Sequence, residues 1–118
     1  MKVALCQINP TVGALNENTL KICEIIKEYS TQCDLLIFPE MVLTGYPPQD
    51  LLLDESFIQK TEEALGGIAS YVKDTAVILG SVRRVKDHLY NTAVIFQGGE
   101  ILGYRYKTHL PTYDVFDE

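Results

Sequence analysis

The sequence contains no tryptophan and no long apolar run. No stretch approaches the roughly 18–20 consecutive apolar residues that a membrane-spanning helix needs. Only the short run Val3–Cys6 separates Lys2 from Gln7, which is too short for the apolar core of a secretory signal. We therefore expect a cytosolic protein without a membrane partner.

Cysteine is also scarce, since the chain has three, Cys6, Cys23 and Cys33. An odd number without a Cys-x-x-Cys spacing argues against a disulfide framework and against a zinc cluster. We interpret all three as reduced, small apolar side chains. The histidines His88 and His109 are isolated in the sequence and lack the spacing of metal ligands. We therefore expect no metal site.

Positive charge is the minority sign, with 10 Lys and Arg against 16 Asp and Glu and a net charge of −6. An acidic chain repels phosphate backbones, so a nucleic-acid partner is not expected. The 118 residues and the 47% hydrophobic content fit one globular domain.

The first third of the chain follows a strand–helix–strand pattern. Residues 2–8 and 34–38 are short apolar runs that predict buried strands. Residues 16–30 carry apolar side chains at helical spacing, with Asn16 as the expected N-cap. Residues 39–50 contain three prolines and a glycine, which predicts a loop. This order is typical of a parallel strand pair in an α/β protein.

The remainder predicts one more helix and an antiparallel meander. The helix begins near Asp54 or Glu55, and the Gly66-Gly67 pair is expected to weaken or bend it. The meander consists of expected strands at 76–82, 89–97 and 100–107, a polar turn at 83–88 and a Gly98-Gly99 hairpin turn. Residues 108–118 show no period and predict a loop. Together the elements predict an α/β fold with a mixed sheet that is covered on both faces.

Two charged residues stand where chemistry is possible. Glu40 follows the second strand directly, and the carboxyl ends of parallel strands line ligand crevices in α/β proteins. A carboxylate there can act as a general base. Lys107 ends the last expected strand and can stabilise an oxyanion if it faces that carboxylate. An exposed acid and a solvated edge lysine are the alternative interpretation, and their separation of 67 residues does not decide between them.

Two longer segments carry a specific resemblance. Phe38–Leu53 (FPEMVLTGYPPQDLLL) resembles the first signature of the nitrilase, or carbon–nitrogen hydrolase, superfamily. Its TGYPPxDLL run is similar to the glutaminase domains of glutamine-dependent NAD synthetases. Tyr106–Glu118 (YKTHLPTYDVFDE) resembles the second signature, and the opening strand and the Tyr90–Ala93 strand also match. The resemblance covers essentially the whole chain.

The resemblance implies an α/β fold, a nitrilase-like α-β-β-α sandwich of which residues 1–118 form the N-terminal portion. It assigns Glu40 as general base and acid and Lys107 as the residue that stabilises the tetrahedral intermediate. It further assigns Tyr46 and Tyr113 to the glutamine pocket and Glu118 as a supporting acid. Glu40 and Lys107 are expected within hydrogen-bond reach of each other, at the carboxyl ends of adjacent strands. The nucleophilic cysteine of the family lies beyond the lysine signature, so none of the three cysteines matches it.

The function implied by the resemblance is hydrolysis of the glutamine amide, with ammonia supplied to a synthetase domain that converts deamido-NAD to NAD. The glutaminase part needs no cofactor, whereas ATP and Mg are implied for the synthetase domain. Glutamine, that synthetase domain and further copies of the chain are the expected partners. Residues 1–118 alone are expected to be inactive. Two alternatives remain open, part of a free-standing amidase or nitrilase and a non-catalytic interaction module.

Overall fold

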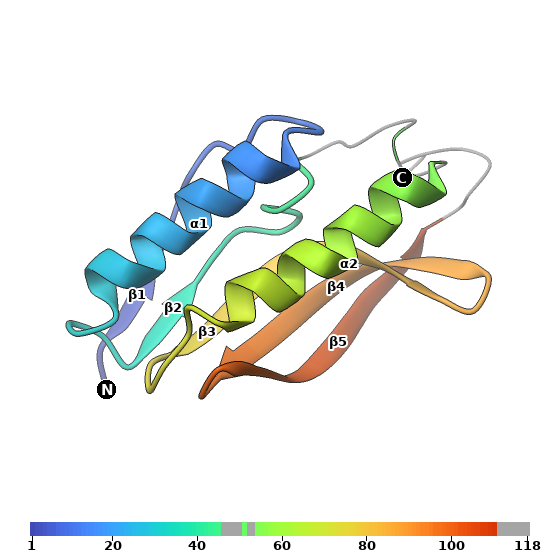
Figure 1. Ribbon diagram of the computed structural model, residues 1–118. Coiled ribbons are helices and arrows are strands. Elements are labelled where there is room, and N and C mark those ends of the chain that lie inside the picture. The colour runs from blue at the N-terminus through green and yellow to red at the C-terminus, as the bar shows by residue number, and fades with distance from the viewer. Residues whose placement is uncertain (46–50, 52–53, 111–118) are drawn as a thin grey trace.

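The computed structural model describes residues 1–45, 51 and 54–110. In this part of the chain, five strands form one sheet in the order β1-β2-β3-β4-β5, and two helices lie against it (Figure 1). Among the described residues, no helix is long and apolar enough to cross a membrane.

The sheet is mixed, as the sequence predicts. β1 (Val3–Leu5), β2 (Leu35–Ile37) and β3 (Ala76–Val85) are parallel neighbours. β4 (His88–Gln97) and β5 (Glu100–Leu110) continue the sheet as antiparallel neighbours. The first two strands are shorter than the apolar runs suggested, because only their central residues pair.

Both helices cover the same face of the sheet. α1 (Leu15–Tyr29) and α2 (Glu55–Ala69) lie side by side in front of the strands (Figure 1). Their apolar stripes bury side chains against alternate residues of the strands, and this layer is the main core. It includes the fully buried Ile22, Ile26, Leu36, Leu65, Ile68, Val77, Leu79, Val94 and Phe96.

The opposite face of the sheet is apolar but less covered. Leu36 is in the core, so its neighbours Leu35 and Ile37 point to the other side of the strand. On the same principle Ala4 packs on the core, whereas Val3 and Leu5 remain exposed. The expectation of cover on both faces therefore does not hold for the described residues, which form one helical layer and one sheet layer.

Several boundaries differ from the prediction. α1 begins at Leu15 with Ala14 at the N-cap and no side-chain cap, so Asn16 lies inside the helix. α2 begins where expected, because the Asp54 carboxylate accepts from the amides of Ser56 and Phe57. It also continues through its glycine pair without interruption.

The three strands of the meander are longer than predicted. β3 and β4 both extend into the expected turn between them, and β5 continues past its expected end. Residues 83–85 belong to β3 and residue 88 to β4, which leaves Lys86 and Asp87 as the turn. Lys86 takes a left-handed backbone angle (φ 57°) there. The Gly98-Gly99 turn is confirmed, and β5 extends to Leu110 rather than ending at Lys107.

Candidate active site

Glu40 lies just past the end of β2, on a segment that turns across β3. The amide of Phe38 donates to the carbonyl of Ile78 (2.9 Å), which continues the ladder for one residue. The amide of Gly80 then donates to the carbonyl of Pro39 (3.2 Å). These two bonds fix the backbone on both sides of Pro39 and so set the point from which Glu40 projects.

Gly80 allows this crossing because it has no side chain. A Cβ at this position would stand 2.6 Å from the Glu40 Cα and 2.4 Å from the Met41 nitrogen. Such distances are shorter than real Cβ contacts, so any other residue would push the segment away from β3. Its cross-strand partner is the small Ala93. Met41 follows with a positive φ of 50°, which marks a sharp turn directly after Glu40.

Lys107 is placed by an irregularity in β5. Thr92 of β4 pairs with Tyr106, whereas Asn91 pairs with Thr108, so Lys107 is an extra residue between two pairs. This is the arrangement of a β-bulge, which locally turns the strand and redirects a side chain. The bulge directs Lys107 toward Glu40.

The two charged side chains meet as the sequence predicts. Lys107 Nζ lies 2.5 Å from Glu40 Oε2, as a hydrogen-bonded ion pair. The lysine side chain is 51% exposed and the glutamate side chain 45% exposed. The predicted location on adjacent strands was wrong, because β3 and β4 lie between β2 and β5 in the sheet. The segment after β2 closes this gap by crossing β3 at Gly80.

The electrostatic environment keeps Glu40 ionised. The hydrogen bond from Lys107 lowers the pKa of the Glu40 carboxyl, and this effect outweighs the opposite effect of partial burial. A second hydrogen bond, from the side chain of Asn91, lowers the pKa further. An ionised carboxylate is the form that can accept a proton.

Asn91 is a further candidate site residue, which the sequence pattern does not single out. It lies on β4, is 4% exposed, and its side chain contributes to the lowered pKa of Glu40. Its Oδ1 is buried without a hydrogen-bond partner in the described structure, which is unusual for a buried polar atom. The sequence does place Asn91 directly before the largely apolar run of residues 92–96. A polar side chain that is buried beside such a run needs a hydrogen-bond partner.

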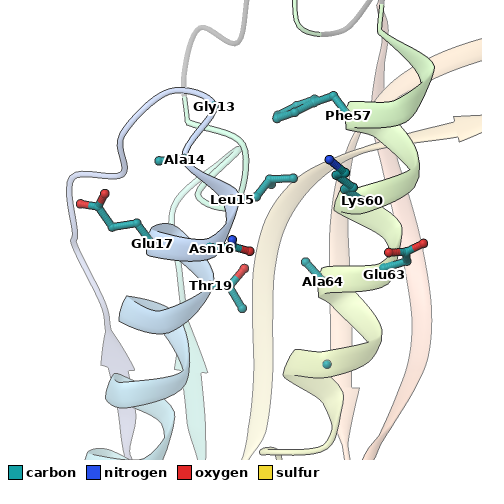
Figure 2. A pocket seen from close by; sticks show the side chains of 11 residues that line it. Gly13, Ala14, Leu15, Asn16, Glu17, Thr19, Phe57, Lys60, Glu63 and Ala64 are labelled. Atoms are coloured by element: carbon teal, nitrogen blue, oxygen red, sulfur yellow. The ribbon is translucent and has the colours of Figure 1, made fainter.

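A pocket of about 90 Å³ surrounds the pair. Glu40, Lys107 and Asn91 line it together with Phe38, Ile78, Leu79, Gly80, Thr92 and Ala93. A much larger groove of about 800 Å³ separates the start of α1 from α2, with Asn16 and Thr19 on one side and Lys60 and Glu63 on the other (Figure 2). The small pocket is the better candidate, because among the described residues it combines a carboxylate of lowered pKa with a hydrogen-bonded cation.

The remaining candidate residues either lie outside the described part of the chain or do not line this pocket in it. Tyr46, Tyr113 and Glu118 lie outside the described residues, as does the side chain of His109. His88 is exposed at the start of β4. In the described ranges, no group of three His, Cys, Asp or Glu side chains could hold a metal ion.

The cysteines behave as apolar residues. Burial raises the pKa of the Cys6 and Cys23 thiols, which disfavours the nucleophilic thiolate. Cys23 is part of the main core, and Cys6 and Cys33 pack against that core. None of the three lines the pocket at Glu40.

Known proteins resemble this chain over almost its whole length. Residues 2–118 match the model of the carbon–nitrogen hydrolase family. A glutamine-dependent NAD(+) synthetase of Synechocystis sp. is 42% identical over 98% of this chain. The match spans 22% of that relative, so the chain covers about a fifth of its length.

Solved structures show the same fold. The glutamine-dependent NAD+ synthetase of Acinetobacter baumannii, solved with ADP, superposes with a TM-score of 0.84 at 39% identity, over 98% of this chain and 22% of that one. An amidase from Nesterenkonia sp. superposes with a TM-score of 0.76 at 22% identity, over 94% of this chain and 44% of that one, which shows a shared fold.

Proposed function

The chain belongs to the carbon–nitrogen hydrolase family, and on that basis we propose that its Glu40–Lys107 pocket cleaves a carboxamide, the side-chain amide of glutamine. The observation that carries the proposal is the 2.5 Å ion pair between residues 67 positions apart. Those residues are the two that the family resemblance assigns to catalysis. The names of the similar synthetases support glutamine as the substrate.

The chemistry of an amide requires both members of the pair. An amide is a poor electrophile, and its nitrogen leaves only when protonated. Glu40, held ionised by Lys107, takes the proton of the attacking nucleophile and then returns it to the departing ammonia. The ammonium group of Lys107 places positive charge beside the carbonyl oxygen as that oxygen becomes negative. Asn91 holds the carboxylate of Glu40 in place for both transfers.

The nucleophile is not one of the three cysteines of this chain. A family enzyme uses a thiol to form an acyl-enzyme, which divides a difficult hydrolysis into two easier steps. Cys6, Cys23 and Cys33 all lie away from the pocket, so residues 1–118 contribute the base and the cation but no thiol. Residues 1–118 by themselves are therefore proposed to be inactive toward glutamine.

The proposed role of the reaction is to supply ammonia. The ammonia would pass to a synthetase site that amidates deamido-NAD with ATP and Mg. Tyr46 and Tyr113 are proposed to contact the glutamine and Glu118 to support the site, all by resemblance. The glutaminase chemistry itself requires no cofactor in this scheme.

The decisive experiment uses the intact protein, meaning the whole natural protein in which residues 1–118 occur. Glu40→Gln keeps the size and a hydrogen-bonding group but removes the base. NAD formation from glutamine should fall by about 10²–10⁴-fold, since the base serves both proton transfers. NAD formation from added ammonium salt should stay near wild type, because it bypasses the amide hydrolysis.

The two rates separate the possible roles of Glu40. Equal loss of both would mean that Glu40 maintains the fold instead of catalysing hydrolysis. An unchanged glutamine-dependent rate would mean that the base lies elsewhere. Asp54→Asn on the distant α2 N-terminus removes another carboxylate and should leave the ratio of the two rates unchanged.

A further inference from the structure

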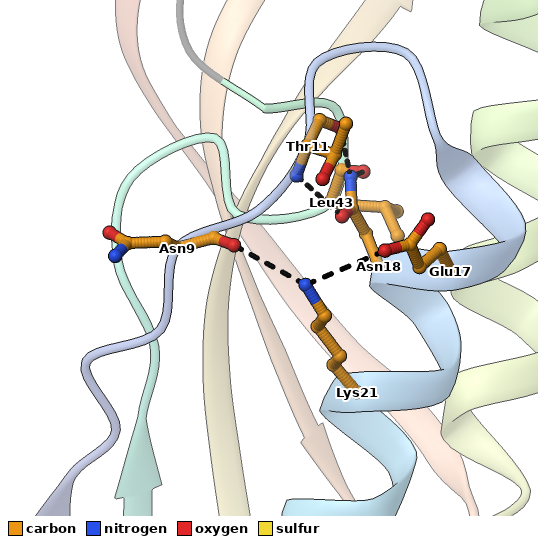
Figure 3. Close-up of polar contacts among 6 residues, drawn as sticks. All are labelled: Asn9, Thr11, Glu17, Asn18, Lys21 and Leu43. Carbon is orange, nitrogen blue, oxygen red and sulfur yellow. Dashed lines mark hydrogen bonds and ion pairs between the residues drawn. The ribbon is translucent and has the colours of Figure 1, made fainter.

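Asn18 is a completely buried polar residue on the first turns of α1. Its Nδ2 donates to the carbonyl of Thr11 (2.8 Å) and to the carbonyl of Leu43 (3.0 Å). Its Oδ1 accepts from the amide of Thr11 (2.9 Å). Figure 3 shows the side chain between the loop that precedes α1 and the segment that carries Leu43. Both amide hydrogens and the oxygen are therefore used.

Leu43 belongs to the segment that begins with Glu40. Its amide donates to the carbonyl of Gly80 (3.4 Å), and Gly80 is the residue against which the Glu40 backbone lies. Residues 41–45 are all buried. The segment is thus held on one side by β3, through Gly80, and on the other by α1, through Asn18.

The same two loops touch at two further points. The amide of Gly13 donates to the carbonyl of Thr44 (3.0 Å). Gly45, with a φ of 82°, lies so close to the other loop that a Cβ would stand 2.6 Å from the Val12 Cα. These contacts involve backbone atoms, so Asn18 contributes the side chain that joins the loops.

Nearby charged contacts cannot replace it. Lys21 reaches Glu17 (3.8 Å) and the carbonyl of Asn9 (3.5 Å), but these groups are at the surface (Figure 3). Surface pairs of this kind contribute little. In contrast, loss of a buried amide leaves its backbone partners without hydrogen bonds.

We propose that Asn18 is a positioning residue for Glu40: its buried amide joins the loop before α1 to the segment 39–45 and so fixes where the carboxylate meets its substrate. This inference rests on the proposed function of Glu40. Asn18 itself does not line the pocket and touches no reacting atom. Misplacement of a catalytic group by about 1 Å can cost on the order of 10² in rate.

The test compares Asn18→Asp and Asn18→Ala with Asn16→Asp and Asn16→Ala in the intact protein. Asn18→Asp is nearly isosteric, but it presents an oxygen instead of a donor to the carbonyls of Thr11 and Leu43. Asn16 is an exposed asparagine on the same helix turn, so its variants match the change in charge and size. Both glutamine-dependent and ammonium-dependent NAD formation are measured, with thermal unfolding as a third readout.

For both Asn18 variants we expect the glutamine-dependent rate to fall by about 10–10²-fold, with kcat reduced more than KM is raised. The ammonium-dependent rate should stay near wild type, and the Asn16 variants should change neither rate. Parallel loss of both rates, an unchanged ratio, or failure of both Asn18 variants to fold while the Asn16 variants fold would overturn the proposal. A wild-type protein without glutamine-dependent activity would instead refute the proposed function.

Discussion

Among the described residues, two hydrogen-bonded pairs of a carboxylate and a cation join distant parts of the chain, and they differ in how completely the cation is bonded. In the first pair, Arg83 of β3 donates through Nε to Glu62 of α2 (3.1 Å) and through Nη1 to the hydroxyl of Tyr106 (2.8 Å). Its guanidinium also lies 3.7 Å from the centre of the Tyr104 ring. In the second pair, among the described residues, the Lys107 ammonium is bonded to Glu40 alone.

The difference fits a structural role for the Arg83 pair and the proposed catalytic role for the Lys107 pair. Arg83 connects α2 to the sheet and stacks on an aromatic ring, which a planar guanidinium does well. Lys107 is a compact charge with three donors, so further donors remain for another oxygen. Under the proposed function, similar ion-pair chemistry therefore serves packing at one place and a reaction at the other.

For the comparison of these two pairs, the largest expected effect comes from Lys107→Met in the intact protein. Loss of the cation removes the charge that meets the developing oxyanion, so glutamine-dependent turnover should fall by roughly 10²–10³-fold. The matched variant Arg83→Met should leave turnover near wild type, because Arg83 does not line the pocket. Steady-state rates for the two variants test the comparison directly, and similar losses in both would contradict it.

A smaller effect is expected on the free energy of unfolding. Here Arg83→Met should cost more than Lys107→Met, which is the opposite of the order expected for turnover. Arg83→Met removes two hydrogen bonds and a cation–π contact and leaves Glu62 without its cation. We expect a loss of about 1–2 kcal/mol, read as a lower midpoint of thermal unfolding. Arg84→Met is the control, since within the described part of the chain Arg84 reaches only the exposed Glu55, at 4.0 Å. A control variant as destabilised as Arg83→Met would argue against a specific role for the cluster.

The smallest expected effect is the pH dependence of the Glu40–Lys107 pair. The lowered pKa of Glu40 means that the pair stabilises the fold above the ordinary pKa of 4.5, and this contribution disappears as the pH falls through the lowered value. Both side chains are about half exposed, so the contribution at pH 7 should stay below about 1 kcal/mol. The difference in unfolding midpoint between wild type and Lys107→Met should therefore shrink on acidification. A difference that grows would contradict the direction of the shift.

The sequence predicted the elements whose signals are local. The α2 helix starts at its Asp54 cap, and the Gly98-Gly99 turn lies where its residues require. Residues 83–85 belong to a mostly polar stretch that predicts a turn, yet they continue β3. Arg83 has its partners on α2 and β5, and no local pattern contains them.

The same distinction between local signals and long-range contacts applies to the site. Glu40 and Lys107 could be named from a family resemblance, but their separation in the sequence did not by itself predict how close their side chains lie. Gly80, Asn91 and Asn18 were missed as site residues because each acts through a close approach between distant segments. Such approaches depend on how the whole sheet is assembled.

The bulge at Lys107 has a consequence for how this segment can diverge. Because Lys107 is an extra residue between two strand pairs, its direction depends on the number of residues in β5 as well as on their identity. Deletion of one neighbouring residue would restore a regular ladder and shift the alternation of side chains by one position. Lineages that retain the proposed activity should therefore tolerate substitutions around Lys107 far better than insertions or deletions there, and gaps in β5 are expected in members that have lost it.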